Sequence, residues 1–402
     1  MTSLVGWRNI RKREDTAMNR QHKQMTAWRH ALHQIPETDF NEHQTAAYIA
    51  TVCTELGYQV ATGIGGTGVV ASLTRGTSTR SIGFRAELDG LLITEAVARP
   101  YASRTPGRMH ACGHDGHMAM LVGAAAQLAA DDRWSGTVRF FFQPDEEHGH
   151  GAHAMLADGV LTRFPVDCIY GIHNMPGMPA GNFATRVGGI MASEDNFVVD
   201  ITGIGGHAAS PHTTIDPLVV GAEIVLALQT IVARSVAPSE PAVVSCTEFI
   251  SDGIRNAIPT HVTIKGDTRS YSPVVQAILE RRMRELVAGI CVAHGATGVV
   301  SYTYEFSPTV NPTAGVAAAV HAAQAVVGPD RVDANTAPLL GSEDFGAFLA
   351  TVPGNFIFIG NGDTGQYATP LHNASYDFND AILPIGAAYL VQLAIDYLHE
   401  TF

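Results

Sequence analysis

The sequence predicts an α/β protein, in which a larger α/β domain with a central mixed sheet is interrupted by a smaller α+β domain. Helical and strand patterns alternate in both outer parts of the chain, which is typical of α/β folds. The strand patterns there are short and continuously apolar, as in strands buried on both faces. From about residue 191, by contrast, polar and apolar residues alternate as they do in half-exposed strands.

A chain of 402 residues exceeds the usual size of one hydrophobic core, so we expect two domains. The expected boundaries are an N-terminal arm over 1–17, the larger domain over 18–190 and 310–402, and the inserted domain over 191–309. The arm is basic and lacks the apolar stretch of a secretory signal.

The first part of the larger domain shows two helical patterns among short strand patterns. The amphipathic run over 43–58 ends at Gly57, a residue type that commonly ends helices. The Ala-rich apolar run over 116–131 predicts a buried helix. The strand patterns are 66–73, 81–88, 137–144 and 168–174.

The inserted domain shows two long helical patterns, over 216–236 and 272–295. Its alternating strand patterns are 194–206, 242–253 and 261–271. Helices set against an alternating antiparallel sheet predict an α+β fold. After Pro312 the continuously apolar patterns of the larger domain return, and they predict a helix over 314–328 and a strand over 355–360.

Charge and composition exclude several classes of protein. The formal net charge is −13, which argues against a nucleic-acid-binding surface. The longest apolar run, after His117, is too short to span a bilayer, so we expect no membrane partner. The 5 cysteines are odd in number and widely spread, which indicates a reducing compartment and a cytoplasmic location.

Polar residues of the kinds that bind ligands follow the buried strands of the larger domain. Glu87 and Asp89 follow one strand, Glu146 and Glu147 the next, and His173 a third. In open α/β sheets the site lies beyond the carboxyl ends of the strands. We therefore expect a functional site at this edge of the sheet.

The segment HACGHDGH, residues 110–117, has three interpretations. Cys112 and His114 offer a thiolate and an imidazole to a borderline metal such as Zn²⁺. As a catalytic thiol, Cys112 would take His114 or His110 as its base. In the third interpretation the segment is a polar helix start with Asp115 as cap. The segment alone does not choose among them.

The adjacent carboxylates Glu146 and Glu147 follow a strand with three phenylalanines. Such a pair can divide the work, since one carboxylate binds a cation while the other takes a proton from water. A solvated acidic turn is the alternative. The apolar strand before the pair and the Gly-rich turn after it favour burial near a site.

Two further histidines extend this set of candidate ligands. His173 ends a buried strand and His372 lies in a loop before the final helix, and either one alone is more often structural than a ligand. Together, one cysteine, three histidines and a glutamate at loop or strand-end positions supply enough ligands for two metal ions. These residues are Cys112, His114, Glu147, His173 and His372.

Three polar residues of the inserted domain are candidates for substrate contacts. His207 follows a Gly-Gly turn, where its imidazole could donate to a developing oxyanion. Asn256 offers a polar donor, and Arg269 at a strand end suits bidentate binding of a carboxylate. An ordinary surface position is the alternative for each of them.

The motifs together resemble the amidohydrolase branch of the M20 metallopeptidase family, which includes hippurate, N-acyl-amino-acid, aminobenzoyl-glutamate and indoleacetyl-amino-acid hydrolases. The resemblance covers nearly the whole chain. It rests on RAELDGL, MHACGHDGHMAMLVGAA, QPDEE, IYGIHNMPG, GIGGHAASPH, GIRNAIP and GSEDFGAFL.

This resemblance implies a site for two divalent ions, with Mn²⁺ or Zn²⁺ expected before Co²⁺ or Ni²⁺. The implied ligands are Cys112, which would bridge the ions, together with His114, Glu147, His173 and His372.

The resemblance also implies roles for residues that do not bind metal. Glu146 matches the general base, and His207 matches a histidine that stabilises the tetrahedral intermediate, in many members at a neighbouring subunit's site. Asn256 and Arg269 match positions on the carboxylate side of the substrate. The inserted domain would be a lid and dimerisation domain, so we expect a homodimer or a higher homo-oligomer.

The chain departs from the usual pattern of this branch in places. Where the branch usually reads RADMDALP, this chain reads RAELDGLL, so Glu87 replaces an Asp near the predicted metals and Leu92 replaces a Pro. After the Glu pair, the usual glycine run becomes HGHGAH and adds His148, His150 and His153. These changes keep the implied metal ligands. They alter the surroundings of the substrate pocket, so the motifs do not identify the substrate.

We therefore expect a metal-dependent hydrolase that cleaves a C–N bond in a small carboxylate-bearing molecule, such as an N-acyl or N-aroyl amino acid. A dipeptidase, or an aminohydrolase that releases ammonia from an aromatic amino-carboxylate, would use the same water activation. A member of another class would bind metal or ligand without catalysis, but Glu146 and every implied ligand are present. A thiol hydrolase that uses Cys112 as its nucleophile would keep its activity when metal ions are removed by a chelator, whereas a metal-dependent hydrolase would lose it.

Overall fold

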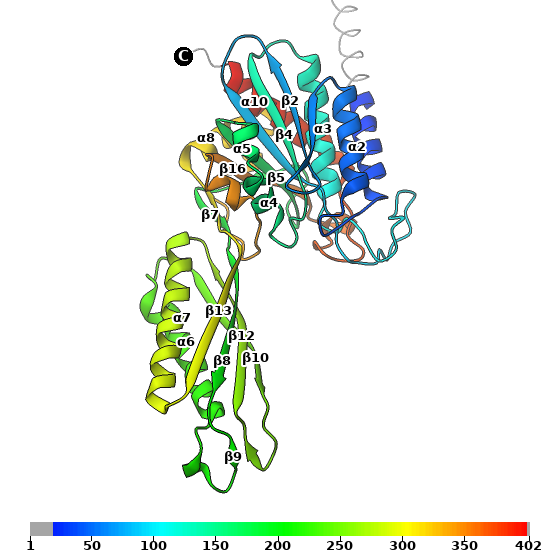
Figure 1. Ribbon diagram of the computed structural model, residues 1–402. Helices are drawn as coiled ribbons and strands as arrows, with labels where there is room; N and C mark the ends of the chain where they lie inside the picture. The colour runs from blue at the N-terminus through cyan, green and yellow to red at the C-terminus, as the bar shows by residue number, and fades with distance from the viewer. Residues whose placement is uncertain (1–18, 400–402) are drawn as a thin grey trace, which may run out of the picture. The chain divides into compact units, whose positions relative to one another are not determined.

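The computed structural model describes residues 19–399, in two compact units (Figure 1). Among these residues, unit 1 consists of 19–187, 311–337 and 348–399, and unit 2 of Gly188–Val310 and Pro338–Ala347. The predicted arm over 1–17 lies outside the described residues.

One segment belongs to a different unit from the domain that the sequence predicted for it. Pro338–Ala347 belongs to unit 2, whereas the prediction assigned it to the larger domain. Its backbone pairs with the start of unit 2, because Leu339 N donates to the Ile190 carbonyl and Ala192 N donates to the Gly341 carbonyl. These partners are far apart in the chain, so no local pattern reveals the pairing.

Unit 1 contains an 8-stranded sheet in the order β1-β2-β4-β3-β5-β16-β6-β15. Strands β4, β3, β5 and β16 run parallel to one another, whereas β1 and β2 at one edge are antiparallel. The predicted α/β class with a central mixed sheet is confirmed. The strand bounds are β1 Gln59–Ile64, β2 Gly68–Arg75, β3 Ser81–Glu87, β4 Gly136–Gln143, β5 Cys168–Pro176, β6 Phe183–Ala184, β15 Val332–Asp333 and β16 Gly354–Gly362.

Helix α3 (His114–Ala130) is the central helix of unit 1 and positions the predicted site. It is buried on nearly every side, because its many alanine and glycine residues are small enough to let neighbouring elements pack closely. It packs against β3 and against α10 (Leu383–His399). The remaining helices of unit 1 are a helix over 19–33, α2 His43–Glu55, α4 Gly151–Ala157, α5 Val160–Arg163 and α8 Thr313–Val327.

Unit 2 is an antiparallel sheet with two helices on one face (Figure 1). The strand order is β10-β12-β8-β13, and β8 alternates buried and exposed residues as predicted. Leu228 of α6 and Leu279 of α7 enter a core with Val199 and Ile264 from the sheet. The bounds are β8 Glu194–Thr202, α6 Pro217–Ser235, β10 Ala242–Ser251, β12 His261–Ser270, α7 Pro273–His294 and β13 Thr297–Phe306.

Two small ribbons complete the sheets. Strand β7 (Gly188–Met191) pairs with β14 (Thr309–Asn311), and β9 (Gly206–His207) pairs with β11 (Ala257–Ile258). Short helical turns make up the remaining elements. They are η1 Pro211–Thr213, η2 Pro329–Arg331, α9 Gly346–Leu349, η3 Gly365–Ala368 and η4 Asp380–Ile382.

Two described helices, α6 and the helical stretch Asp380–His399, are long and apolar enough to cross a membrane by length and composition alone. Helices in the core of soluble proteins pass the same test, so this is weak evidence for a membrane span. The second packs within unit 1, where half of its apolar window is buried, whereas only 28% of the α6 window is buried.

Candidate metal centre

Segments from four parts of unit 1 place the predicted ligands together at the end of the parallel strands. Cys112, His114 and His173 form one group whose ligand atoms lie within 4.8 Å of one another. Cys112, Glu147 and His372 form a second group of the same size. Cys112 belongs to both groups, so its thiolate would be available to a metal ion held by either of them.

The two histidines of the first group present fixed nitrogen atoms. Nδ1 of His114 donates to the carbonyl of Asp89 at 2.8 Å, and Nδ1 of His173 donates to the carbonyl of Asn174 at 2.7 Å. When the rings are neutral, as in metal-binding histidines, their Nε2 atoms therefore carry the lone pairs. Nε2 of His173 lies 3.4 Å from Sγ of Cys112. Such backbone anchors are typical of metal-binding histidines.

Unsatisfied atoms at the centre fit a cation. Nε2 of His114 and Oε1 of Glu147 are buried without a hydrogen-bond partner among the described residues, and they lie 3.8 Å apart. An unmade hydrogen bond at a buried polar atom costs about 1–3 kcal/mol. A divalent ion between ligands of this kind would satisfy both atoms at once.

Charges around the centre also favour cations. Burial raises the pKa of the Cys112 thiol well above its ordinary value, and the carboxylates Glu147 and Glu146 raise it further. Burial alone would lower the pKa of His114, but Asp89 and the nearby carboxylates raise it to about 10. The site therefore holds an excess of negative charge that protons or metal ions must balance.

The second group includes a backbone strained at His372. This residue has φ 61°, in the left-handed region that non-glycine residues rarely adopt. Its backbone N–H donates to the Ala111 carbonyl at 2.8 Å, and its Nε2 lies 3.3 Å from Oε2 of Glu147. Strain of this kind concentrates at ligand-binding sites. The loop thus presents the half-exposed His372 ring to the buried Glu147.

Glu146 lies beside the two groups, with Oε2 3.7 Å from Nε2 of His114. Only 6% of the residue is exposed, which agrees with the predicted burial and not with the alternative of a solvated acidic turn. Asp145 before it has φ 44°, and the backbone N–H of Glu147 donates to Oδ2 of Asp89 at 3.0 Å. Both carboxylates approach Nε2 of His114, Glu146 at 3.7 Å and Glu147 at 3.8 Å.

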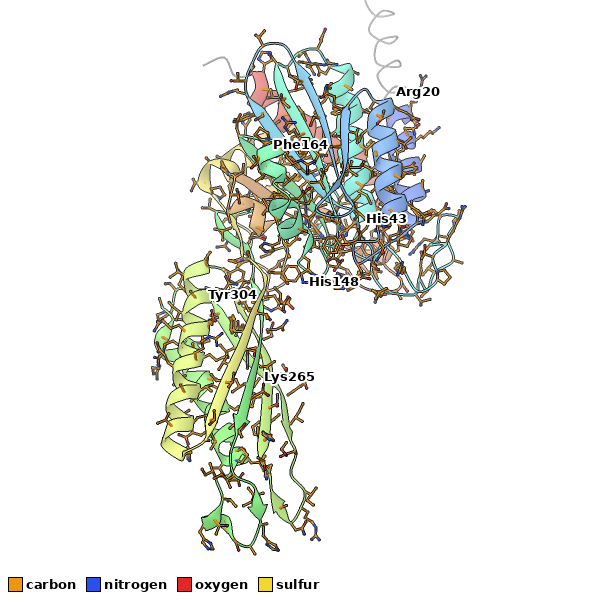
Figure 2. The ribbon with its side chains drawn as sticks, viewed as in Figure 1. Arg20, His43, His148, Phe164, Lys265 and Tyr304 are labelled. Atoms are coloured by element: carbon orange, nitrogen blue, oxygen red, sulfur yellow. The ribbon has the colours of Figure 1, made fainter. Side chains whose placement is uncertain are left out.

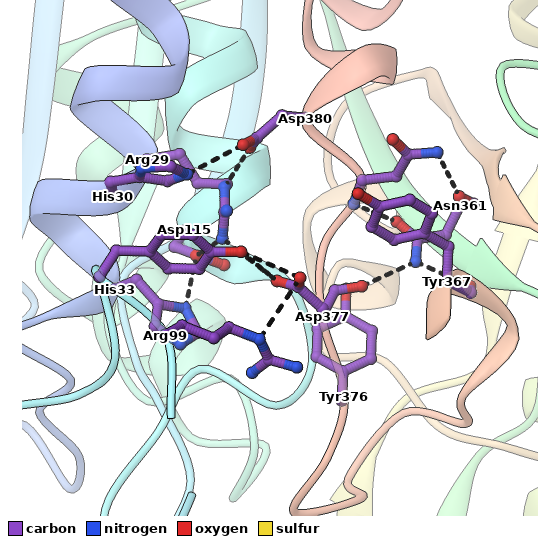
Figure 3. A network of polar contacts seen from close by, with 12 residues as sticks. Arg29, His30, His33, Arg99, Asp115, Asn361, Tyr367, Tyr376, Asp377 and Asp380 are labelled. Carbon is purple, nitrogen blue, oxygen red and sulfur yellow. Dashed lines mark hydrogen bonds and ion pairs between the residues drawn. The ribbon is translucent and has the colours of Figure 1, made fainter. Parts of the chain in front are cut away.

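The helix-cap interpretation of HACGHDGH is wrong, because Asp115 makes no capping hydrogen bond to α3. Its carboxylate instead lies 3.1 Å from Nη1 of Arg29 and 2.8 Å from Nδ1 of His33 (Figure 3). Burial would raise the pKa of Asp115, but His33 and Arg29 hold it well below its usual range. The buried network therefore fixes the start of α3, next to His114.

The thiol-nucleophile interpretation lacks the electrostatic setting it requires. Reactive cysteines have a lowered pKa and cationic neighbours. Cys112 has a raised pKa and is surrounded by carboxylates. The arrangement suits a thiolate that forms when a metal binds.

Several buried residues around the centre were not singled out as site residues from the sequence. Nδ2 of Asn174 donates to the Cys112 carbonyl, and the hydroxyl of Tyr376 donates to Oδ1 of Asn174. Asn174 could have been found from its place directly after His173. The ring of His117 forms hydrogen bonds with the Glu87 carboxylate and the backbone N–H of Asn174. Neither ring nitrogen of His110 has a hydrogen-bond partner among the described residues.

The added histidines His148, His150 and His153 are exposed on the surface of unit 1; Figure 2 labels His148. Nδ1 of His148 lies 2.8 Å from Oδ1 of Asp145, and its Nε2 lies 3.5 Å from Oδ1 of Asp39. None of the three belongs to the two groups that share Cys112.

In unit 2 the structure brings His207 and Asn256 together on the ribbon of β9 and β11. The residue after His207, Ala208, donates its N–H to the Asn256 carbonyl at 3.1 Å. The backbone N–H of Ala209 donates to Nδ1 of His207 at 3.0 Å. Nδ1 is therefore an acceptor, and the neutral ring carries its proton on Nε2, as a hydrogen-bond donor to an oxyanion must.

Arg269 lies apart from this pair within unit 2. Strand β11 leads into the first residues of β12, whereas Arg269 lies near the last, about 26 Å along the strand from His261. Its guanidinium contacts the carboxylates of Glu194 and Asp267, each at 2.7 Å. Its predicted contact with a substrate carboxylate stays a prediction.

Comparison with known proteins matches residues 83–396 to Peptidase family M20/M25/M40. The chain belongs to this family. The M20 resemblance predicted from the motifs is thereby confirmed, and membership makes this M20 protein an enzyme that hydrolyses C–N bonds.

Individual M20 relatives match over nearly the full chain. Hippurate hydrolase of Campylobacter jejuni is 37% identical over 370 residues, which cover 92% of this chain and 95% of the relative. A solved structure from methicillin-resistant Staphylococcus aureus, assigned as an aminohydrolase, is 32% identical with a TM-score of 0.89 over 95% of this chain and 98% of its own. The YXEP protein of Bacillus subtilis, a dinuclear metal-binding M20 peptidase, is 30% identical with a TM-score of 0.82 over 94% and 99%.

Proposed function

We propose that this M20 enzyme hydrolyses the amide bond of a small N-acyl or N-aroyl amino acid with the help of two divalent metal ions. The observation that carries the proposal is the pair of ligand groups that share Cys112, with Glu146 beside them. The similarity to hippurate hydrolase supports an N-aroyl amino acid as the substrate class.

The metal ligands in this proposal are the predicted ones. The set combines sulfur, nitrogen and oxygen donors, which suits Mn²⁺ or Zn²⁺ first and also admits Co²⁺ or Ni²⁺. When bound, such ions supply Lewis acidity, which polarises a carbonyl and lowers the pKa of water. The residues are Cys112, His114, Glu147, His173 and His372.

The protein's own groups would carry the protons. Glu146 would take a proton from the attacking water and return it to the departing nitrogen. His207 would donate its Nε2 proton in a hydrogen bond to the carbonyl oxygen as negative charge develops there. Asn256 and Arg269 are the proposed contacts of the substrate carboxylate. Asn256 adjoins His207 on the same ribbon, whereas Arg269 lies near the far end of β12, so the two contacts at one site would come from different copies of the chain.

The second candidate function is hydrolytic deamination. The same water activation serves it, and the similarity to the Staphylococcus aureus aminohydrolase supports it. The two reactions differ in the nitrogen product, because an amidase releases an amino acid and a deaminase releases ammonia.

The test is metal removal and reconstitution combined with a substrate screen. Chelation should abolish turnover of N-acyl amino acids, and Mn²⁺ or Zn²⁺ should restore it, since the proposed hydrolysis depends on Lewis acidity. Free amine and ammonia should be measured separately for N-acyl amino acids, dipeptides and aminobenzoates. Full activity after chelation, with loss after thiol alkylation, would contradict the proposal and favour a thiol hydrolase.

We also propose that the enzyme is a homodimer formed through unit 2, in a cytoplasmic location. Helix α6 exposes apolar side chains, with Leu226 72% and Val219 56% exposed, and the edge strand β10 exposes Phe249 and Ile250. Clusters of exposed apolar side chains on one unit commonly mark an interface with another protein chain. All five cysteines are free, which suits a reducing compartment.

A mixing experiment tests whether His207 serves the site of a second copy. His207→Ala and Glu146→Gln subunits should each be nearly inactive alone. Mixed in equal amounts with subunit exchange, they should regain about a quarter of wild-type activity, because half of the dimers are hybrids with one complete site. No recovery despite confirmed exchange would place His207 at the site of its own chain.

A further inference from the structure

Glu87, the residue that replaces the usual Asp, ends strand β3 in the interior of unit 1. Its side chain is 1% exposed. Its Oε1 accepts a hydrogen bond from Nη1 of Arg85, and its Oε2 accepts one from Nδ1 of His117 at 2.7 Å. The carboxylate therefore joins the sheet to helix α3, which carries His117 one turn after His114.

His117 is held as a single tautomer by its two partners. The backbone N–H of Asn174 lies 2.9 Å from Nε2, and because it can only donate, Nε2 must accept. The ring proton is consequently on Nδ1, where Glu87 receives it. Nε2 of His117 is occupied, so His117 supports the site rather than binding metal, although Glu87, His114 and His117 also form a compact group.

Asn174 passes this constraint to the Cys112 turn. Its Nδ2 donates to the carbonyl of Cys112 at 2.6 Å, and its Oδ1 accepts from the hydroxyl of Tyr376 at 2.6 Å. The approach is so close that a Cβ at Gly113, which has φ +95°, would lie 2.2 Å from Nδ2 of Asn174. The turn that carries Cys112 thus rests directly on Asn174.

The same asparagine follows His173 in strand β5, and its carbonyl accepts the Nδ1 proton of that histidine. One residue therefore contacts both members of the pair whose Sγ and Nε2 face each other at 3.4 Å. The path from Glu87 through His117 and Asn174 ends on Cys112 and His173.

We propose that Glu87 is a positioning residue that fixes the tautomer of His117 and so holds Asn174 where it aligns Cys112 with His173. This inference rests on the proposed metal site. Side-chain length matters, because aspartate would withdraw the carboxylate by about 1.5 Å and leave His117 beyond hydrogen-bonding distance at an unchanged backbone. An amide is also inadequate, since it has one oxygen to serve both Arg85 and His117.

The first measurement is Co²⁺ titration of metal-free protein, followed by the absorption of its thiolate complex. Glu87→Gln and Glu87→Asp should each weaken Co²⁺ binding about 10–100-fold and alter the thiolate band. The matched control is Asp195→Asn, which removes a buried carboxylate of unit 2 that hydrogen-bonds Thr268, Gln276 and Tyr302 of the same unit. It should leave Co²⁺ affinity and spectrum as in the wild type.

The second measurement needs no metal. Long-range ¹H–¹⁵N spectra of histidine-labelled, metal-free protein should show His117 with its proton on Nδ1 in the wild type and a mixture of tautomers in Glu87→Gln. A failure of the wild type to bind Co²⁺ would refute the metal site itself. If the wild type binds, but both folded Glu87 variants match it in affinity, thiolate band and His117 tautomer, the role of Glu87 is refuted. If Glu87→Gln does not fold, Glu87→Asp alone decides.

Discussion

Glu146→Gln is expected to lower kcat by about 10²–10⁴-fold, the usual contribution of a general base. Glutamine has nearly the same volume but cannot accept a proton from water or return it to the leaving nitrogen. The residue lies 3.7 Å from His114 and forms a further candidate ligand group with His114 and Glu147, but it is not among the five proposed ligands, so we expect metal content to be preserved. Steady-state kinetics and metal analysis of the same preparation give both readouts.

The neighbouring carboxylate supplies the control. Glu147→Gln changes the same functional group one residue away, but Glu147 belongs to the second ligand group. We expect this variant to lose metal affinity along with activity. Near-normal turnover in Glu146→Gln would contradict the general-base assignment, whereas metal loss in Glu146→Gln would make that residue a ligand.

Arg29→Met is expected to lower the free energy of unfolding by about 3–5 kcal/mol, because it removes one partner from buried ion pairs. The Arg29 side chain is 0% exposed and contacts Asp115, Asp377 and Asp380 (Figure 3). Burial would lower the pKa of the guanidinium, but the three carboxylates raise it well above its usual range. The charge is therefore retained in the folded protein.

Chemical denaturation followed by circular dichroism measures this loss. Arg133→Met is the control, since Arg133 pairs with Asp131 but its side chain is 68% exposed. Exposed ion pairs contribute little to stability, so this variant should stay close to the wild type. Equal stability of the two variants would show that the Arg29 network does not hold unit 1 together.

The elements of the fold could be predicted because their signals are local. The helices predicted over 43–58 and 216–236 correspond to α2 and α6, and the apolar strand over 168–174 lies within β5. Periodicity and turn residues depend only on neighbours in the chain. Strand β13 and the edge strand β1 were not named in advance, because pairing with other strands defines them as much as composition does.

The candidate ligands were also predictable, but their arrangement was not. Residue type and a loop or strand-end position selected Cys112, Glu147 and His372 from the sequence. That Cys112 belongs to two ligand groups depends on contacts between segments separated by much of the chain. Spacing along the chain carries no information on such distances.

The sequence by itself determined the α/β class, the inserted unit and the chemical types available to a metal site, because side-chain patterns and donor atoms are local properties. The tertiary structure alone decided how those donors are used. It assigned Asp115 to a charge network rather than a helix cap, and it turned the Nε2 of His117 to Asn174. It also placed carboxylates around Arg269. Hydrogen-bond direction and charge pairing exist only between atoms brought together by folding.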